Sequence, residues 1–168
     1  GRRLFIEFEG VNSSSTVSFN GVTLGTHDGG YSTFRFDVTE LVKDENKIEV
    51  KVDNSPNDYV YPERADFTFY GGIYRDVYLI ETDDVHFPLL SNGGPGVKVY
   101  TQVEDGTGVL SFSSECNGDE CVLEIGGDEY HFPVINRVLD GSVRIESVHL
   151  WDGKRDPYLY PLTFSLLL

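Results

Sequence analysis

The sequence contains no Met and only one Trp, and basic residues are scarce: 13 Lys and Arg stand against 28 Asp and Glu, for a formal net charge of −15. It has no cluster of basic residues of the kind that binds nucleic-acid phosphates or anionic lipids, so we expect neither nucleic acid nor a membrane surface as a partner. No apolar run approaches the roughly 20 residues needed to cross a bilayer. Because a natural reading frame begins with Met and this chain begins inside a strand-like apolar run, we interpret it as part of a longer protein.

Motifs of the common catalytic and cofactor-binding sites are also missing. There is no Walker loop, no His-Glu-x-x-His zinc motif, no Gly-x-Ser-x-Gly elbow and no dinucleotide-binding glycine pattern after a strand. No pair of carboxylates stands out as the acid and base that sugar hydrolysis requires. The expectation is therefore no cofactor, no metal site and no catalytic residue within the chain. The His residues lack the spacing of metal ligands and are His27, His86, His131 and His149.

Cysteine is scarce as well, with Cys116 and Cys121 as the two examples. If the polar residues between them form a hairpin tip, the two side chains could face each other at a separation compatible with a disulfide. A disulfide would fit an oxidising compartment. Two reduced thiols are the alternative, and the sequence leaves both open.

What the sequence has in abundance is residues that favour strands and turns. It contains 11 Phe and 10 Tyr together with many Val, Ile and Thr, while 18 Gly and 7 Pro interrupt the chain at short intervals. Asn20-Gly21 separates two alternating runs and predicts a type I′ hairpin turn. Gly126-Gly127 predicts a second hairpin turn. One capped helical turn is expected at residues 37–41, with Asp37 as N-cap and Glu40 completing the capping box.

The spacing of the strand-like runs predicts an all-β fold in two domains. The character of the sequence shifts near Thr82-Asp83-Asp84, so we place the domains at residues 1–82 and 83–168. Short strands separated by turns, with no helical periodicity between them, indicate small sandwiches. The expected strands are residues 4–8, 16–19, 22–24, 32–36, 47–52 and 73–80 in the first domain and 97–103, 109–112, 122–125, 129–134, 142–148 and 158–167 in the second.

Residues 66–77 carry the most specific pattern of the chain, Asp-Phe-Thr-Phe-Tyr-Gly-Gly-Ile-Tyr-Arg-Asp-Val. This segment resembles the Asp-x5-Gly-Ile-x-Arg signature of glycoside hydrolase family 2, the β-galactosidase and β-glucuronidase family. Residues 29–39 and 50–54 resemble further segments of the same domain of that family. Residues 150–152 and 157–160 resemble the end of the family's second, immunoglobulin-like domain, so the resemblance covers nearly the whole chain.

The resemblance implies a truncated jelly-roll-type β-sandwich over residues 1–82, followed by an immunoglobulin-like β-sandwich over residues 83–168. Strands that precede residue 1 in relatives would be missing, which leaves a sheet edge or face uncovered. The resemblance also implies a parent enzyme, a retaining glycosidase of β-galactosidase type, whose two catalytic glutamates lie on a (β/α)8 barrel after the second β-domain. The fragment alone would then be inactive, and would help to form the sugar pocket and to position the barrel.

One residue receives a role from the resemblance. In family members the signature Asp reaches into the pocket and helps to bind the non-reducing sugar; here it is Asp66. A carboxylate can accept charge-assisted hydrogen bonds from two vicinal hydroxyls. The alternative is a loop Asp that fixes its own backbone. Arg75 is expected in a structural ion pair or packing contact, while Phe69, Tyr70 and Tyr74 either face a sugar or pack in the core.

Two other functions remain open beside the glycosidase: a free-standing carbohydrate-binding protein, and a structural or adhesive pair of β-sandwiches. Trp151 is expected at a buried interface rather than on a sugar platform. The sequence does not select between galactose, glucuronic acid and mannose. A periplasmic or extracellular location is suggested only by the two cysteines and by a polysaccharide substrate.

Overall fold

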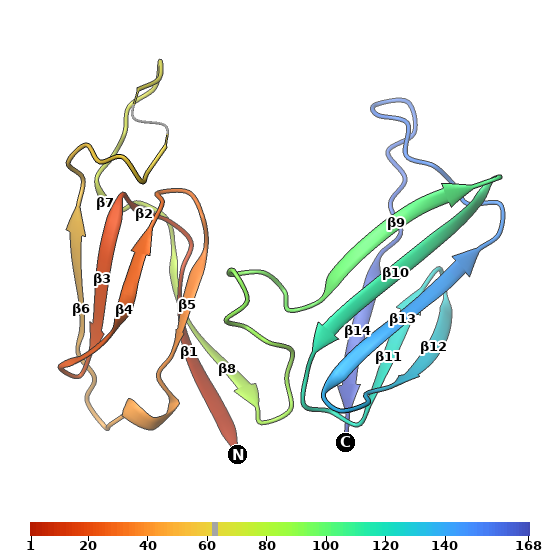
Figure 1. The fold of residues 1–168 in the computed structure, drawn as a ribbon, viewed down its shortest axis with the longest axis horizontal. Helices are drawn as coiled ribbons and strands as arrows, with labels where there is room; N and C mark the ends of the chain where they lie inside the picture. Colours follow the sequence, from red (N-terminus) through yellow and green to blue (C-terminus); the bar gives the residue numbers. More distant parts are fainter. Residues whose placement is uncertain (62–63) are drawn as a thin grey trace. The chain divides into compact units, whose positions relative to one another are not determined.

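The computed structural model describes residues 1–61 and 64–168, and it consists of antiparallel strands joined by turns and loops (Figure 1). Within these residues the one helical element is a 3-10 turn, η1 (Thr39–Leu41). The all-β fold class is therefore confirmed. The described residues include no helix that is long and apolar enough to cross a membrane. The chain divides into two compact units, one of Gly1–Asp84 with Leu89–Gly94 and one of Val85–Pro88 with Pro95–Leu168.

The first unit is a sandwich of two three-stranded sheets with one small sheet at its end. Its strands are β1 (Arg2–Phe8), β2 (Val11–Asn12), β3 (Ser14–Phe19), β4 (Val22–Asp28), β5 (Phe34–Asp37), β6 (Ile48–Asp53), β7 (Gly72–Ile73) and β8 (Val77–Asp83). One sheet has the order β5-β1-β8 and the other β4-β3-β6, while β2 pairs with β7. Alternation in β1 and β3 points apolar residues inward from both sheets, which builds one core between them.

The sandwich is open at its β8 edge. There, within the described residues, apolar side chains of β8 that face the core side of the sheet are not covered by the other sheet. The opposite edge is closed by contact between β4 and β5. Val77 and Leu79 pair with Phe8 and Ile6 across the β8–β1 ladder, so all four lie on the same face of the sheet. Phe8 and Ile6 are each 1% exposed, whereas Val77 and Leu79 are 42% and 64% exposed.

Both predicted hairpin turns are confirmed by their backbone angles. Asn20 and Gly21 have φ of 51° and 82° between β3 and β4. Gly126 and Gly127 have φ of 64° and 92°. Positive φ at both central residues is what a type I′ turn requires, and glycine adopts it without steric cost.

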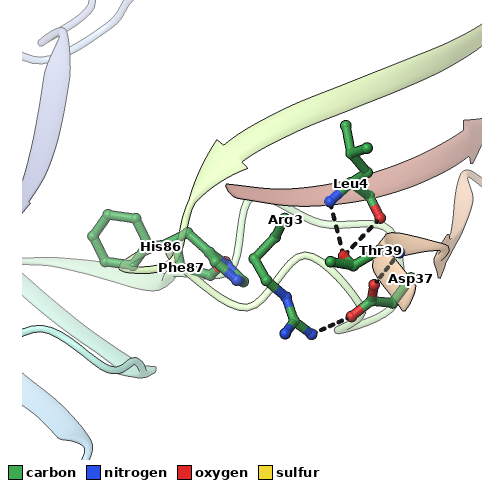
Figure 2. A network of polar contacts seen from close by, with 6 residues as sticks. All are labelled: Arg3, Leu4, Asp37, Thr39, His86 and Phe87. Carbon is green, nitrogen blue, oxygen red and sulfur yellow. Dashed lines mark hydrogen bonds and ion pairs between the residues drawn. The ribbon is translucent and has the colours of Figure 1, made fainter. Parts of the chain in front are cut away.

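The helical turn is present, but its capping differs from the prediction. Val38 rather than Asp37 occupies the N-cap position, and no side-chain cap bond is formed there. Asp37 Oδ1 instead accepts a hydrogen bond from the Thr39 N–H at 3.0 Å, and Asp37 Oδ2 lies 2.5 Å from Arg3 Nη2 (Figure 2). The Leu4 N–H donates to Thr39 Oγ1 at 2.9 Å, so the turn is fastened to β1.

These contacts lower the pKa of Asp37. Partial burial of the carboxyl group acts in the opposite direction and raises the pKa, but hydrogen bonds from Thr39 and Arg3, together with the charge of Arg3, outweigh it. The ionised form of Asp37 is therefore stabilised in the folded state.

The single strand predicted over residues 73–80 is wrong, because the chain is interrupted at residues 74–76. β7 pairs with β2, whereas β8 pairs with β1 in a different sheet. The opposing segment is interrupted at the same place, between β1 and β2, where residues 9–10 face residues 74–76. Hydrogen bonds from the Glu9 N–H to the Asp76 carbonyl and from the Tyr74 N–H to the Gly10 carbonyl span the gap, so the extra residue makes a bulge in the pairing. Gly72, with φ of 89°, supplies the left-handed backbone beside this break.

The second unit is also a sandwich, and its strands follow the predicted pattern of short runs. They are β9 (Lys98–Glu104), β10 (Thr107–Glu115), β11 (Glu120–Ile125), β12 (Asp128–Pro133), β13 (Val138–Ile145) and β14 (Leu162–Leu167). The sheet orders are β13-β10-β9 and β12-β11-β14 (Figure 1). Phe112 of β10 and Leu123 of β11 bring the two inner faces together, and they are 2% and 0% exposed.

The segment between Cys116 and Cys121 connects the two sheets and is not a hairpin tip, because β10 and β11 have different partners. Both residues are free thiols buried in the core of the second unit. Burial raises the pKa of both thiols, and for Cys121 burial together with the nearby Cys116 raises it to about 11. The sequence left a disulfide and two reduced thiols open, and the structure contains the two reduced thiols.

Candidate functional site

The signature segment begins as an irregular loop that presents the side chain of Asp66 to solvent. Asp66 makes no hydrogen bond or ion pair with another described residue. Two residues earlier in the chain do fix their own backbone: Asp53, the last residue of β6, accepts from the Ser55 N–H at 2.9 Å, and Asn57 in the long connection accepts from the Tyr59 N–H at 3.0 Å. Among the described residues, the Asp66 carboxylate is therefore available to an outside donor.

A buried amide, Asn12, anchors the loop that carries Asp66. Asn12 is 5% exposed, and its Nδ2 donates to the Tyr70 carbonyl at 2.9 Å and to Asn54 Oδ1 at 3.2 Å. The backbone at Gly71 and Gly30 packs so closely against the two amide side chains that a larger residue would clash. A Cβ on Gly71 would lie 2.8 Å from Asn54 Nδ2, and one on Gly30 would lie 2.6 Å from Asn12 Oδ1. The sequence interpretation gave Asn12 no role, because its burial and its hydrogen-bond partners exist only in the folded chain.

The residues after the loop hold the neighbouring segment at residues 30–31. The Tyr74 hydroxyl donates to the Gly30 carbonyl, and Arg75 Nη1 donates to the Tyr31 carbonyl at 3.2 Å. The Arg75 guanidinium also lies 5.3 Å from the centre of the Tyr74 ring. Arg75 thus makes structural contacts, as expected, but forms no ion pair among the described residues.

Aromatic rings follow Asp66 directly. The Phe67 and Phe69 rings are tilted against each other with centroids 4.9 Å apart. Phe67 and Tyr70 are 53% and 69% exposed, whereas Phe69 is half-buried. Phe69 lines a cavity of about 110 Å³ together with the amides of Asn12 and Asn54, and Asp66 is not among the lining residues. The carboxylate and the exposed rings therefore belong to the outer surface of the loop.

This arrangement suits a ligand that carries hydroxyl groups and a weakly apolar face. A carboxylate accepts hydrogen bonds from hydroxyls, and an aromatic ring offers a flat apolar surface. No group of three or more His, Cys, Asp or Glu in the described part of the chain is arranged to hold a metal ion. The loop can therefore bind such a ligand and orient it.

The comparison with protein families decides the nature of this unit. Residues 1–83 match the family described as glycosyl hydrolases family 2, sugar binding domain. Residues 1–83 belong to this family. The family prediction, made from the signature at residues 66–77, is confirmed.

Relatives of known activity agree with this assignment. A β-glucuronidase of Bacteroides fragilis is 33% identical over 99% of this chain and 27% of its own length. A β-galactosidase of Thermoanaerobacter pseudethanolicus is 42% identical over 51% of this chain and 12% of its own length. The crystal structure of an FMN-binding β-glucuronidase from Faecalibacterium prausnitzii L2-6 superimposes with a TM-score of 0.86 at 32% identity, over 99% of this chain and 27% of that one.

Nearly all of this chain matches the two β-glucuronidases, but it spans only about a quarter of their length. Its second unit is included in those matches, since they cover 99% of the chain. The sandwich architecture of both units is thus that of the corresponding part of a larger glycosidase.

Proposed function

We propose that these residues are the non-catalytic β-domains of a longer retaining glycosidase, and that the first domain forms one side of the sugar pocket through Asp66. The observation that carries the proposal is the match of residues 1–83 to the family 2 sugar-binding domain. The exposed Asp66 carboxylate, on a loop anchored by the buried Asn12, supports it. A catalytic barrel outside these residues would supply the general acid/base and the nucleophile.

The substrate class that we propose is a β-linked galactoside or glucuronide with a free non-reducing end. The relatives include enzymes named for each of these activities. Asp66 would accept hydrogen bonds from two adjacent hydroxyls of the terminal sugar, which galactose and glucuronic acid both provide. The choice between the two sugars would then belong to residues of the barrel.

The test is the Asp66→Ala substitution in the full-length parent enzyme, assayed with aryl β-galactosides and aryl β-glucuronides. A hydrogen bond to a charged group contributes roughly 1.5–3 kcal/mol, so kcat/KM should fall about 10- to 150-fold on the preferred substrate. Asp44→Ala is the control, because Asp44 is an exposed loop Asp outside the signature segment. An Asp66→Ala enzyme that retains kcat/KM within about twofold of the parent would remove Asp66 from the pocket.

A free-standing carbohydrate-binding module is the second candidate, and calorimetric titration of the 168-residue chain separates the two. The fragment proposal predicts no detectable binding of galactose, glucuronate or mannose at millimolar concentration, because most of the pocket would lie elsewhere. Micromolar binding that is lost in Asp66→Ala would favour the self-sufficient module and contradict the fragment proposal.

A further inference from the structure

The second unit presents a group of large apolar side chains to solvent from the connection between β13 and β14. Leu150, Trp151 and Leu159 are 55%, 63% and 73% exposed, respectively. Single exposed apolar residues are common on protein surfaces, but a group of them marks an interaction site. These three residues, with the cavity beside them, are called the Trp151 surface below.

The connection that carries the Trp151 surface is held in place by its own contacts. The Asp152 N–H donates to the Asp156 carbonyl at 2.7 Å, and His149 Nε2 lies 2.6 Å from Asp156 Oδ2. The His149 ring stacks on Tyr158 with centroids 4.3 Å apart, and the His149 N–H donates to the Tyr160 hydroxyl at 3.0 Å. Leu150, Trp151 and Leu159 are thus exposed by an ordered backbone.

A cavity of about 270 Å³ lies between this connection and strands β9 and β10. Its lining is almost entirely apolar and includes Leu110, Ile145 and Trp151, while Thr101, Gln102 and His149 are its polar members apart from tyrosine hydroxyls. A sugar has hydroxyl groups all around its ring and needs several hydrogen-bonding partners. Two of the polar groups here are already engaged within the chain, because His149 Nε2 lies beside Asp156 Oδ2 and the Tyr160 hydroxyl accepts from the His149 N–H, so few partners are left for a sugar. An apolar protein surface fits the cavity better, since interface cores are enriched in Trp and Tyr and depleted of charge.

We propose that the Trp151 surface is the docking site for the part of the parent glycosidase that lies outside these 168 residues. The proposal rests on the proposed function, because it requires that parent. The β-glucuronidase of Bacteroides fragilis that matches 99% of this chain does so over only 27% of its own length, so a parent of that size would contain a large partner body within the same polypeptide. A surface of this kind, left bare by the described residues, is covered in that assembly by apolar side chains of the partner body.

The experiment is hydroxyl-radical footprinting of the full-length parent, with each side chain compared with its own rate in the unfolded protein. Trp151 has a matched control in Tyr100, which is also 63% exposed and does not line the cavity. Strong protection of Trp151 with little protection of Tyr100 is the expected result. Equal modification of the two residues, relative to their unfolded rates, would overturn the proposal.

Two further outcomes identify other occupants and would also overturn it. Protection of Trp151 that grows with protein concentration would indicate a second copy of the chain. Protection that requires added sugar would indicate a carbohydrate site. A Leu159→Ser parent gives a second measurement: its Tm should fall, whereas Tyr100→Ser should leave Tm nearly unchanged, and equal effects would count against docking.

Hydrolysis of aryl β-glycosides, measured on the same preparation, separates this inference from the proposed function. A protected Trp151 in a protein without glycosidase activity would refute the function and leave the docking surface standing. An active glycosidase with an unprotected Trp151 would refute only the docking surface.

Discussion

The ion pair between Arg35 and Glu7 offers the sharpest test of how the first unit is held together. The side chains are only 12% and 11% exposed, and Arg35 Nε donates to the Glu7 carboxylate. Arg35 Nη1 also donates to the carbonyls of Leu89 and Gly94, at 2.9 and 2.7 Å. One guanidinium thus fixes a buried carboxylate and fastens the Leu89–Gly94 segment to the β5-β1-β8 sheet.

The substitution Arg35→Met keeps an unbranched apolar side chain but leaves Glu7 buried without a partner. Removing one member of a buried pair costs about 3–5 kcal/mol, because the remaining charge is not compensated. Domains of this size are stable by roughly 5–15 kcal/mol, so the free energy of unfolding of the first unit should fall by a large fraction. The carbonyls of Leu89 and Gly94 also lose their donor in this variant, which lowers the free energy of unfolding further.

The measurement is hydrogen exchange of the β1 amides as a function of urea, compared between the parent chain and Arg35→Met. Fluorescence of Trp151 follows the second unit and should change little, since Trp151 is the one Trp of the chain. Lys47→Met is the control in the same unit, because its pair with Glu49 at 2.9 Å has both side chains more than half exposed and should contribute no more than about 1 kcal/mol.

A loss of less than about 1 kcal/mol in Arg35→Met would refute this reasoning, because a buried unpaired carboxylate costs more than that. The double variant Glu7→Leu with Arg35→Met provides a second check. It removes both charges, so it should be more stable than Arg35→Met alone. A double variant that is less stable than the single one would show that the pair is not the source of the loss.

Three further predictions follow from particular contacts. Asp37→Asn should be less stable than the parent chain at neutral pH. The folded pKa of Asp37 lies below its unfolded value, so the ionised carboxylate stabilises the folded state above the unfolded pKa. The difference between the two free energies of unfolding should therefore shrink below about pH 4. Urea titrations at several pH values measure this, and a constant difference down to pH 2 would contradict it. The Cys121 thiol, with a pKa of about 11, should react with a disulfide reagent at pH 8 only after unfolding, and rapid labelling of the native chain would show the burial to be wrong. Gly141→Ala should lower the free energy of unfolding by about 1–3 kcal/mol, because the added Cβ would lie 2.6 Å from the Phe112 ring. Gly94→Ala meets only an ordinary contact at 3.4 Å and should be nearly neutral. Thermal unfolding measures both variants.

The sequence by itself determined the features that depend on neighbouring residues. Alternating apolar residues gave strands such as β3 and β6, since successive side chains of a strand point to opposite faces. Asn20-Gly21 gave its hairpin, because a type I′ turn needs two residues that tolerate positive φ. The signature at residues 66–77 identified the family, and the local reason is a fixed spacing of Asp, Gly, Ile and Arg in one continuous segment.

Only the tertiary structure decided the features that depend on which strands pair. The break at residues 74–76 arises as a bulge opposite residues 9–10, where the paired segment is itself interrupted between β1 and β2. Cys116 and Cys121 flank a connection between sheets, because β10 and β11 have different partners. Asn12 reaches the carbonyl of Tyr70 across 58 positions of sequence, and no local pattern encodes a contact at that distance. The loop that carries Asp66 is held by hydrogen bonds and close glycine contacts between segments far apart in the chain, which exist only once the sheets have formed.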